Sequence, residues 1–280
     1  MTTYSRTRAG RIGKYIALGL YVLFLAAPLF WLVSVSFKSN AELFDLTQSW
    51  IPRDPTLDNF IVIFDEFPLV TSLLNSLIVS TASAAGSVLL GTPIAYVMAR
   101  QRSLITKGTT AWILGSQMLP FITILVPLFL LIIRLGLYDT REALILVYIV
   151  WSLPFAVWML RNYIRSIPVE LEQAAALDRA NSFQIMFRII GPLALPGLIV
   201  AFLFAFIQAW NEFFFALVII KNPDLAPLSL MLVRFIGNDA GVRMGPLAAA
   251  SLLSAIPNLI LFAFLQRRLV QGLLGGSVRG

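Results

Sequence analysis

Cysteine and histidine are both absent from the 280 residues of this chain. Their absence excludes thiol chemistry, a disulfide framework, zinc sites and histidine-based acid/base catalysis. Charged residues are also few, at 12%, while 59% of the residues are apolar and the mean hydropathy is +0.85. Soluble domains carry about a quarter charged residues. The composition therefore predicts an all-α polytopic membrane protein.

Six apolar stretches are long enough to cross about 30 Å of hydrocarbon as helices. We expect transmembrane helices at residues 15–37, 69–99, 110–133, 143–160, 193–220 and 245–265. With a cytoplasmic N-terminus, most lysines and arginines fall on the cytoplasmic side, as the positive-inside rule requires. The C-terminus is then cytoplasmic too. The net charge of +7 is spread along the membrane boundaries rather than clustered with aromatic residues, so nucleic-acid binding is not expected.

Polar side chains at membrane depth are candidates for a substrate pathway, because an unpartnered amide or carboxylate there costs several kcal/mol. The candidates are Asn75, Gln117, Gln208, Trp210, Asn211 and Glu212. An aromatic ring beside amide and carboxylate groups can stack on a sugar ring and bind its hydroxyl groups. Hydrogen bonds between helices, with Trp210 at the membrane interface, explain the same residues equally well.

A polar island from Ile167 to Pro196 separates two long apolar segments. Pro168 suits the first turn of a helix, which we expect from about Val169 to Leu177, and Asn181-Ser182 offers a new N-cap. One narrow face of the helix carries Leu171, Ala174, Ala175 and Asp178, and the two alanines allow another protein to approach closely. The alternative is an ordinary amphipathic helix at the membrane surface, followed by a membrane helix that Gly191-Pro192 and Pro196-Gly197 interrupt.

The island resembles the EAA coupling loop of bacterial ABC importer permeases, whose pattern is Glu-Ala-Ala, three residues, Gly, nine residues, Ile, one residue, Leu-Pro. Ala174, Ala175, Ile189 and Pro192 match this pattern. Three positions depart from it: Gln173 replaces the glutamate, Arg179 the glycine and Gly191 the leucine. The sequence Trp210-Asn211-Glu212-Phe213 also resembles the sugar-uptake branch of these permeases. By the same resemblance, the connection from Lys221 to Met244 corresponds to an outer loop that reaches toward the solute-binding protein, and a plain linker is the alternative.

The resemblance implies a single permease domain, residues 1–280, with the type I ABC importer fold and a cytoplasmic coupling loop, residues 161–192, between spans four and five. The implied partners are a second permease subunit, two ATP-binding subunits, an extracytoplasmic solute-binding protein and the lipid of the bacterial inner membrane. No cofactor is expected on this chain, since it has no glycine-rich phosphate loop and the partner subunits would bind ATP and Mg. The residues expected to contact the ATPase are Pro168, Glu170, Leu171, Glu172, Gln173, Ala174, Ala175, Asp178 and Arg179.

Two other functional classes compete with the sugar permease. One is a secondary transporter driven by an ion gradient, with Glu212 as the titrating carboxylate. Against it stand the small number of spans and the lack of a visible half-chain repeat, which many such carriers have. The other is a membrane-embedded enzyme, for which the sequence offers no nucleophile and base.

Overall fold

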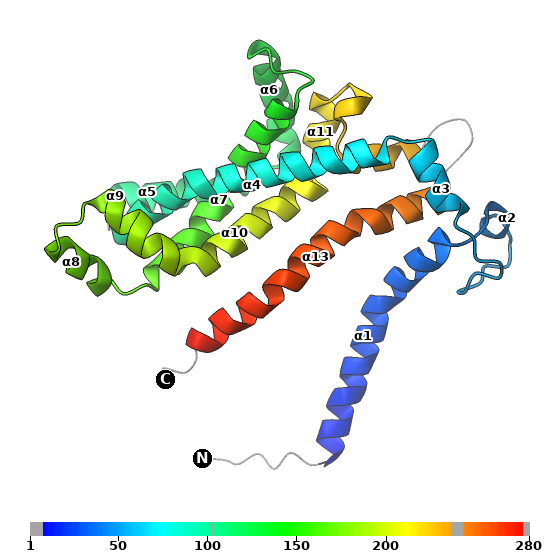
Figure 1. The fold of residues 1–280 in the computed structure, drawn as a ribbon, viewed down its shortest axis with the longest axis horizontal. Helices are drawn as coiled ribbons and strands as arrows, with labels where there is room; N and C mark the ends of the chain where they lie inside the picture. The colour runs from blue at the N-terminus through cyan, green and yellow to red at the C-terminus, as the bar shows by residue number, and fades with distance from the viewer. Residues whose placement is uncertain (1–7, 102, 237–242, 277–280) are drawn as a thin grey trace. The chain divides into compact units, whose positions relative to one another are not determined.

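A computed structural model describes residues 8–101, 103–236 and 243–276, which are nearly all helical and contain no β-strand (Figure 1). Five helices in these residues are long and apolar enough to cross a membrane: Ile12–Ser36, Leu69–Arg100, Arg141–Arg165, Ser182–Asn211 and Met244–Ala263. They correspond to the first, second, fourth, fifth and sixth predicted spans. The chain divides into two compact units, residues 1–69 with 232–255 and residues 70–231 with 256–280.

The first unit contains α1 (Arg8–Ser36), α2 (Asn40–Leu43), α3 (Asp58–Asp65), η3 (Val233–Phe235) and the start of α13 (Met244–Gly276). Lys38, directly after α1, is fully buried. Its ammonium group donates a hydrogen bond to the carbonyl of Ser49 at 2.5 Å and lies 4.6 Å from the ring centre of Trp31. Asn59 donates to the carbonyls of Ser36 and Lys38. The connection after α1 is therefore folded against the end of that helix.

The second part of the predicted outer loop joins this first unit, where Arg243 forms an ion pair with Glu66 at 2.6 Å. The guanidinium hydrogen bonds lower the pKa of the Glu66 carboxyl. The neighbouring rings of Phe67 and Phe235 lie 4.3 Å apart. Residues 237–242 of the predicted Lys221–Met244 loop lie outside the described residues.

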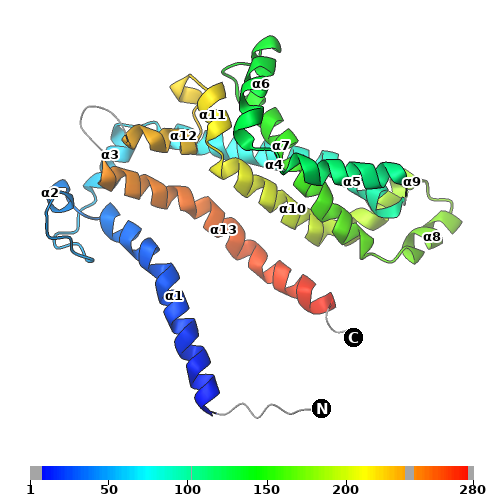
Figure 2. The same ribbon diagram turned by 180° about the vertical axis from the view of Figure 1, so that it is seen from behind.

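In the second unit, α4 (Leu69–Arg100), α7 (Arg141–Arg165) and α10 (Gly191–Asn211) run lengthwise beside one another (Figures 1 and 2). Small side chains allow the close approach of α4 and α7. The hydroxyl groups of Ser87 and Ser152 lie 2.6 Å apart, and a Cβ at Gly86 would overlap the side chain of Ile149. Gly86 therefore allows α7 to approach α4 at a point where any side chain would be in the way.

The predicted third span, residues 110–133, is not one continuous helix. The chain forms α5 (Leu104–Ser116) and α6 (Phe121–Arg134), with Gln117–Pro120 between them. Proline lacks a backbone N–H and disfavours helical geometry at the residue before it, so Pro120 ends one helix and precedes the next. Hydropathy averaged over a long window does not reveal this interruption, because the residues on both sides of it are apolar.

The structure differs from the predicted fifth span, residues 193–220, at both ends. Four residues separate the short α8 (Glu170–Leu177) from α9 (Ser182–Gln184). From α9 the helix continues without a break through the π-helix η1 (Ile185–Ile190) into α10. Gly191 does not interrupt the helix, because its N–H reaches five residues back to Met186 O and the wider turn accommodates Pro192. After α10 the chain breaks at Glu212 and continues as α11 (Phe214–Ile219), η2 (Pro223–Leu225) and α12 (Leu228–Leu232).

Candidate functional site

The polar island folds as predicted into a short helix, α8, with Asn181 as the N-cap of the following helix. Pro168 lies just before this helix instead of in its first turn. The helix has an inner face formed by Glu172 and Ala175, which are only 9% and 8% exposed. The remaining predicted contact residues are exposed, and they are Pro168, Glu170, Leu171, Gln173, Ala174, Asp178 and Arg179.

Glu172 is held from inside the chain by two residues of α4. Its carboxylate accepts a hydrogen bond from Arg100 Nε at 2.6 Å and another from the Tyr96 hydroxyl at 2.9 Å. A second guanidinium nitrogen of Arg100 donates to the carbonyl of Ile167 at 3.1 Å. We call Tyr96, Arg100 and Glu172 the Glu172 cluster. The sequence prediction counted Arg100 only as a cytoplasmic positive charge and missed Tyr96, although the two residues stand four apart on one helix face.

The two motif alanines have different environments. Ala175 packs in an apolar cluster with Ile167, Ala95 and Met98, whereas Ala174 is exposed. On the exposed side Ala174 shares a stripe with Glu170 and Leu177, at i, i+4 and i+7. Leu177 is 86% exposed and was not among the predicted contact residues. The signal for it was a large apolar side chain beside the charged residues Asp178 and Arg179.

Arg179 ends α8 in a left-handed conformation, with φ of 63°. Its N–H reaches Ala176 O and the N–H of Ala180 reaches Ala175 O, both at 3.0 Å, which is the Schellman arrangement. This geometry favours glycine, which explains why the family pattern has glycine at this position.

Replacing Arg179 by glycine should therefore stabilise the end of α8 by roughly 1 kcal/mol, because glycine adopts positive φ without the steric penalty of a Cβ. Slower hydrogen exchange of the α8 amides would report this. Arg179→Ala is the matched control, since it removes the same charge but keeps the Cβ. Equal exchange rates in the glycine and alanine variants would contradict this account.

Asn75 holds a segment of backbone that follows α11. Its side-chain amide donates to the carbonyls of Asp224 at 2.8 Å and Ala226 at 3.2 Å. The adjacent Ser76 hydroxyl accepts the N–H of Leu228. Both amide protons of Asn75 are therefore used within the chain, and the first part of the predicted outer loop folds back onto α4.

Glu212 lies at the break between α10 and α11 and satisfies backbone groups that the break exposes. Its carboxylate accepts the N–H of Phe215 at 2.8 Å, the N–H of Ala216 at 3.2 Å and the hydroxyl of Tyr148 at 2.7 Å. The carbonyl of Glu212 accepts the Ser229 hydroxyl at 2.6 Å. These contacts correspond to the interhelical hydrogen-bond interpretation of this residue.

The other four pathway candidates have different environments, and they do not form one cluster. Trp210 is buried and stacks on Phe206, with ring centres 5.6 Å apart. Asn211 is exposed and donates to Ile207 O in its own helix. The side-chain oxygen of Gln208 is buried and has no hydrogen-bond partner among the described residues. Gln117 is exposed at the end of α5.

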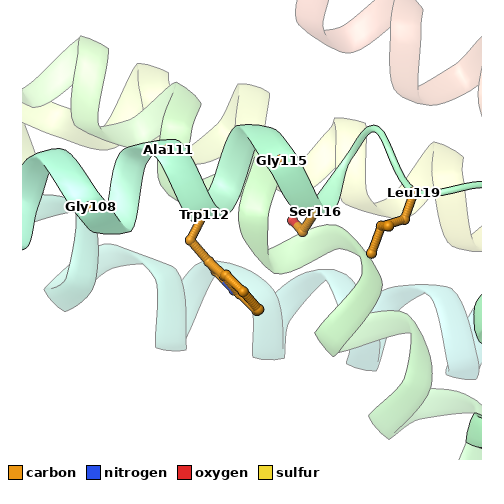
Figure 3. Close-up of a pocket in the computed structure, with 6 residues that line it drawn as sticks. All are labelled: Gly108, Ala111, Trp112, Gly115, Ser116 and Leu119. Atoms are coloured by element: carbon orange, nitrogen blue, oxygen red, sulfur yellow. The ribbon is translucent and has the colours of Figure 1, made fainter.

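An apolar hollow of about 480 Å³ runs along α5 and reaches Leu119 in the segment that follows the helix. Gly108, Ala111 and Gly115 leave room for it because they carry little or no side chain. The side chains of Trp112 and Ser116 project from α5 beside it, and that of Leu119 from the segment after α5 (Figure 3). Its lining is almost entirely apolar. Sugar hydroxyl groups would find few partners there.

The model of the family described as "Binding-protein-dependent transport system inner membrane component" matches residues 91–274, which include α7, α8 and α10. This chain belongs to that family. The permease is 48% identical to a putative ABC transporter permease protein of Streptomyces antibioticus over 82% of this chain and 100% of the relative. It is also 33% identical to the trehalose transport system permease protein of Mycobacterium tuberculosis, over 93% of this chain and 95% of the relative.

A solved bacterial ABC transporter involved in the import of the acidic polysaccharide alginate has the same fold as this permease. The TM-score is 0.81 at 24% sequence identity, and the match covers 95% of this chain and 99% of the other. The family assignment made from the EAA loop is therefore confirmed. The permease is a multi-pass protein of the inner membrane.

Proposed function

We propose that the chain is a transmembrane permease subunit of an ATP-driven, binding-protein-dependent importer of a di- or oligosaccharide. The observation that carries this proposal is α8, a short helix between two membrane-spanning helices, with its inner face bound to α4 and its outer face uncovered. Family membership and the trehalose relative support the sugar assignment. The proposed orientation has both termini and α8 in the cytoplasm, in line with the positive-inside rule.

In this proposal the exposed stripe of Glu170, Ala174 and Leu177 contacts one of two separate ATPase subunits, which bind ATP and Mg. Ala174 allows close approach, Leu177 contributes apolar area and Glu170 pairs with a basic residue of the partner. The flanking exposed residues complete the contact, and they are Pro168, Leu171, Gln173, Asp178 and Arg179. Closure of the ATPases on ATP would move two permease subunits between outward-open and inward-open states.

The solute-binding protein would deliver the sugar from outside. Gln208, Asn211 and Gln117 remain proposed sugar contacts, because the polar groups of Asn75 and Glu212 are used within the chain and Trp210 is buried against Phe206. The side-chain amides of Asn211 and Gln117 are exposed, so they are accessible to a sugar hydroxyl.

The ATPase contact is tested by Ala174→Arg in the tagged permease, purified in mild detergent. A guanidinium on the outer stripe should reduce the co-purified ATPase subunit by about tenfold or more, because a long charged side chain prevents close approach. Ala176→Arg is the matched control: it places the same side chain at an exposed position of the same helix, away from the stripe. Ala175 is unsuitable for this test because it is buried, so arginine there would disrupt the permease itself.

Undiminished recovery of the ATPase with Ala174→Arg would refute this contact. Recovery of the wild-type permease as a homo-oligomer without any ATPase would refute the proposed function as a whole.

A further inference from the structure

The Glu172 cluster joins two parts of the chain that are far apart in sequence, since Arg100 and Glu172 are 72 positions apart. Arg100 contacts α8 at two points, the Glu172 carboxylate in its first turn and the Ile167 carbonyl just before it. Tyr96, one turn earlier on α4, binds the other carboxylate oxygen. The two donors fix both the position and the orientation of the Glu172 carboxylate, because hydrogen bonds to a charged group are strong and directional.

The pair is shielded from water, with side chains only 17% and 11% exposed for Arg100 and Glu172. Exposed pairs contribute little because solvent screens them, but removing one member of a shielded pair leaves the other charge without a partner. Removing one member of the cluster should therefore cost more than removing one member of an ion pair on the surface.

The apolar contacts of the same helix are of a different kind. Ala175 and Ile167 pack with Ala95 and Met98 of α4. Apolar contact is non-directional, so it stabilises the packed state but sets the orientation of the two segments less strictly than hydrogen bonds to a charged group do. Among the described residues, the cluster supplies the directional contacts between α4 and the segment that contains α8.

We propose that the Glu172 cluster is the element that makes α4 move together with α8 when the ATPase acts on the outer stripe. Arg100, Glu172 and Tyr96 are positioning residues in this role, since they contact neither ATP nor sugar. The inference rests on the proposed function, and it adds the route by which movement of α8 reaches a membrane-spanning helix. It also assigns Glu172 to the inside of the permease instead of the ATPase contact.

The test measures the distance between α4 and α8 in the complete complex. Because the chain has no cysteine, Gln101→Cys and Ala176→Cys place two spin labels on exposed sites, one directly after α4 and one on α8. The complex, with its other subunits made free of cysteine, is examined by EPR with and without Mg·ATP. The permease that carries the two labels and an intact Glu172 cluster should give one narrow distance distribution, and Mg·ATP should leave that distribution unchanged.

Arg100→Gln and Glu172→Gln should give a distribution that shifts or broadens when Mg·ATP is added, and the double variant should match the single ones. Tyr96→Phe removes a single hydroxyl and should fold normally, with a smaller change in the same direction. Arg100→Lys keeps the charge but cannot contact Glu172 and Ile167 with two nitrogens, so it should rescue only in part.

If the distance distributions of the variants stay narrow with Mg·ATP, the inference is overturned. Apolar packing alone would then keep α4 and α8 together. Broadening of equal size without nucleotide would overturn it as well, because the cluster would then only support the fold. If the proposed function itself were wrong, the wild-type permease would purify without an ATPase, and this result distinguishes the two cases.

Discussion

Replacing Glu212 by alanine should destabilise the permease by about 3 kcal/mol and abolish transport. The substitution leaves the N–H groups of Phe215 and Ala216 and the hydroxyl of Tyr148 without their acceptor. An unsatisfied buried donor costs about 1–3 kcal/mol, and a lost helix cap typically about 1 kcal/mol. Thermal unfolding in detergent should show a midpoint several degrees lower.

Asn211→Ala is the matched control for this experiment, because the neighbouring amide is exposed and donates only to a carbonyl of its own helix. Its unfolding midpoint should stay close to that of the unsubstituted permease. Glu212→Gln should fall between the two, since an amide has only one oxygen to accept from three donors. A stable Glu212→Ala protein whose uptake no longer depends on an ion gradient would instead favour the secondary transporter.

Replacing Gly197 by leucine should prevent the correct packing of α7 and α10 and cause the largest loss of folded protein among single substitutions in α10. A Cβ at Gly197 would lie 2.6 Å from Cγ and 2.9 Å from Cδ1 of the Tyr163 ring, which is far inside van der Waals contact. Over-packing by single methylene groups already costs about 1–3 kcal/mol. The amount of monodisperse permease recovered in detergent is the measurement.

Gly19→Leu is the matched control, because it makes the same change on α1 at a position with no atom within 4 Å of the new Cβ. It should leave recovery unchanged. The smaller change Gly197→Ala should be partly relieved by Tyr163→Ala, which removes the opposing ring. Additive losses in that double variant would show that the two residues do not define the approach of these helices.

The sequence predicted α8 almost to the residue because its start and stop signals are local, namely the acidic first turn and the N-cap at Asn181. The inner face of α8 could not be predicted in the same way. Ala174 and Ala175 are identical in chemistry, and what decides between them is the position of Arg100, 72 residues before Glu172. Periodicity within eight residues contains no information about such a partner.

The polar residues at membrane depth could be picked out from the sequence, but their hydrogen-bond partners belong to backbone that the sequence does not locate. Asn75 and Glu212 were predicted either along a substrate pathway or in hydrogen bonds between helices, and both satisfy backbone groups of the segment around α11 and α12. A helix break in a membrane leaves backbone N–H and C=O groups without helical partners. Side chains must bind these groups, because lipid offers no water to do so. The break at Glu212 lies in an apolar stretch and has no proline or glycine to mark it.

The π-helix at Ile185–Ile190 also changes the register of everything that follows it. One wide turn takes up an additional residue, and each residue of an α-helix turns the chain by about 100°. The side chains of α10 therefore point about a quarter turn away from where the repeat of the preceding helix would direct them. Gly197 faces Tyr163 only in this shifted register, so deletion of one residue between Ile185 and Ile190 would rotate a different face of α10 toward α7.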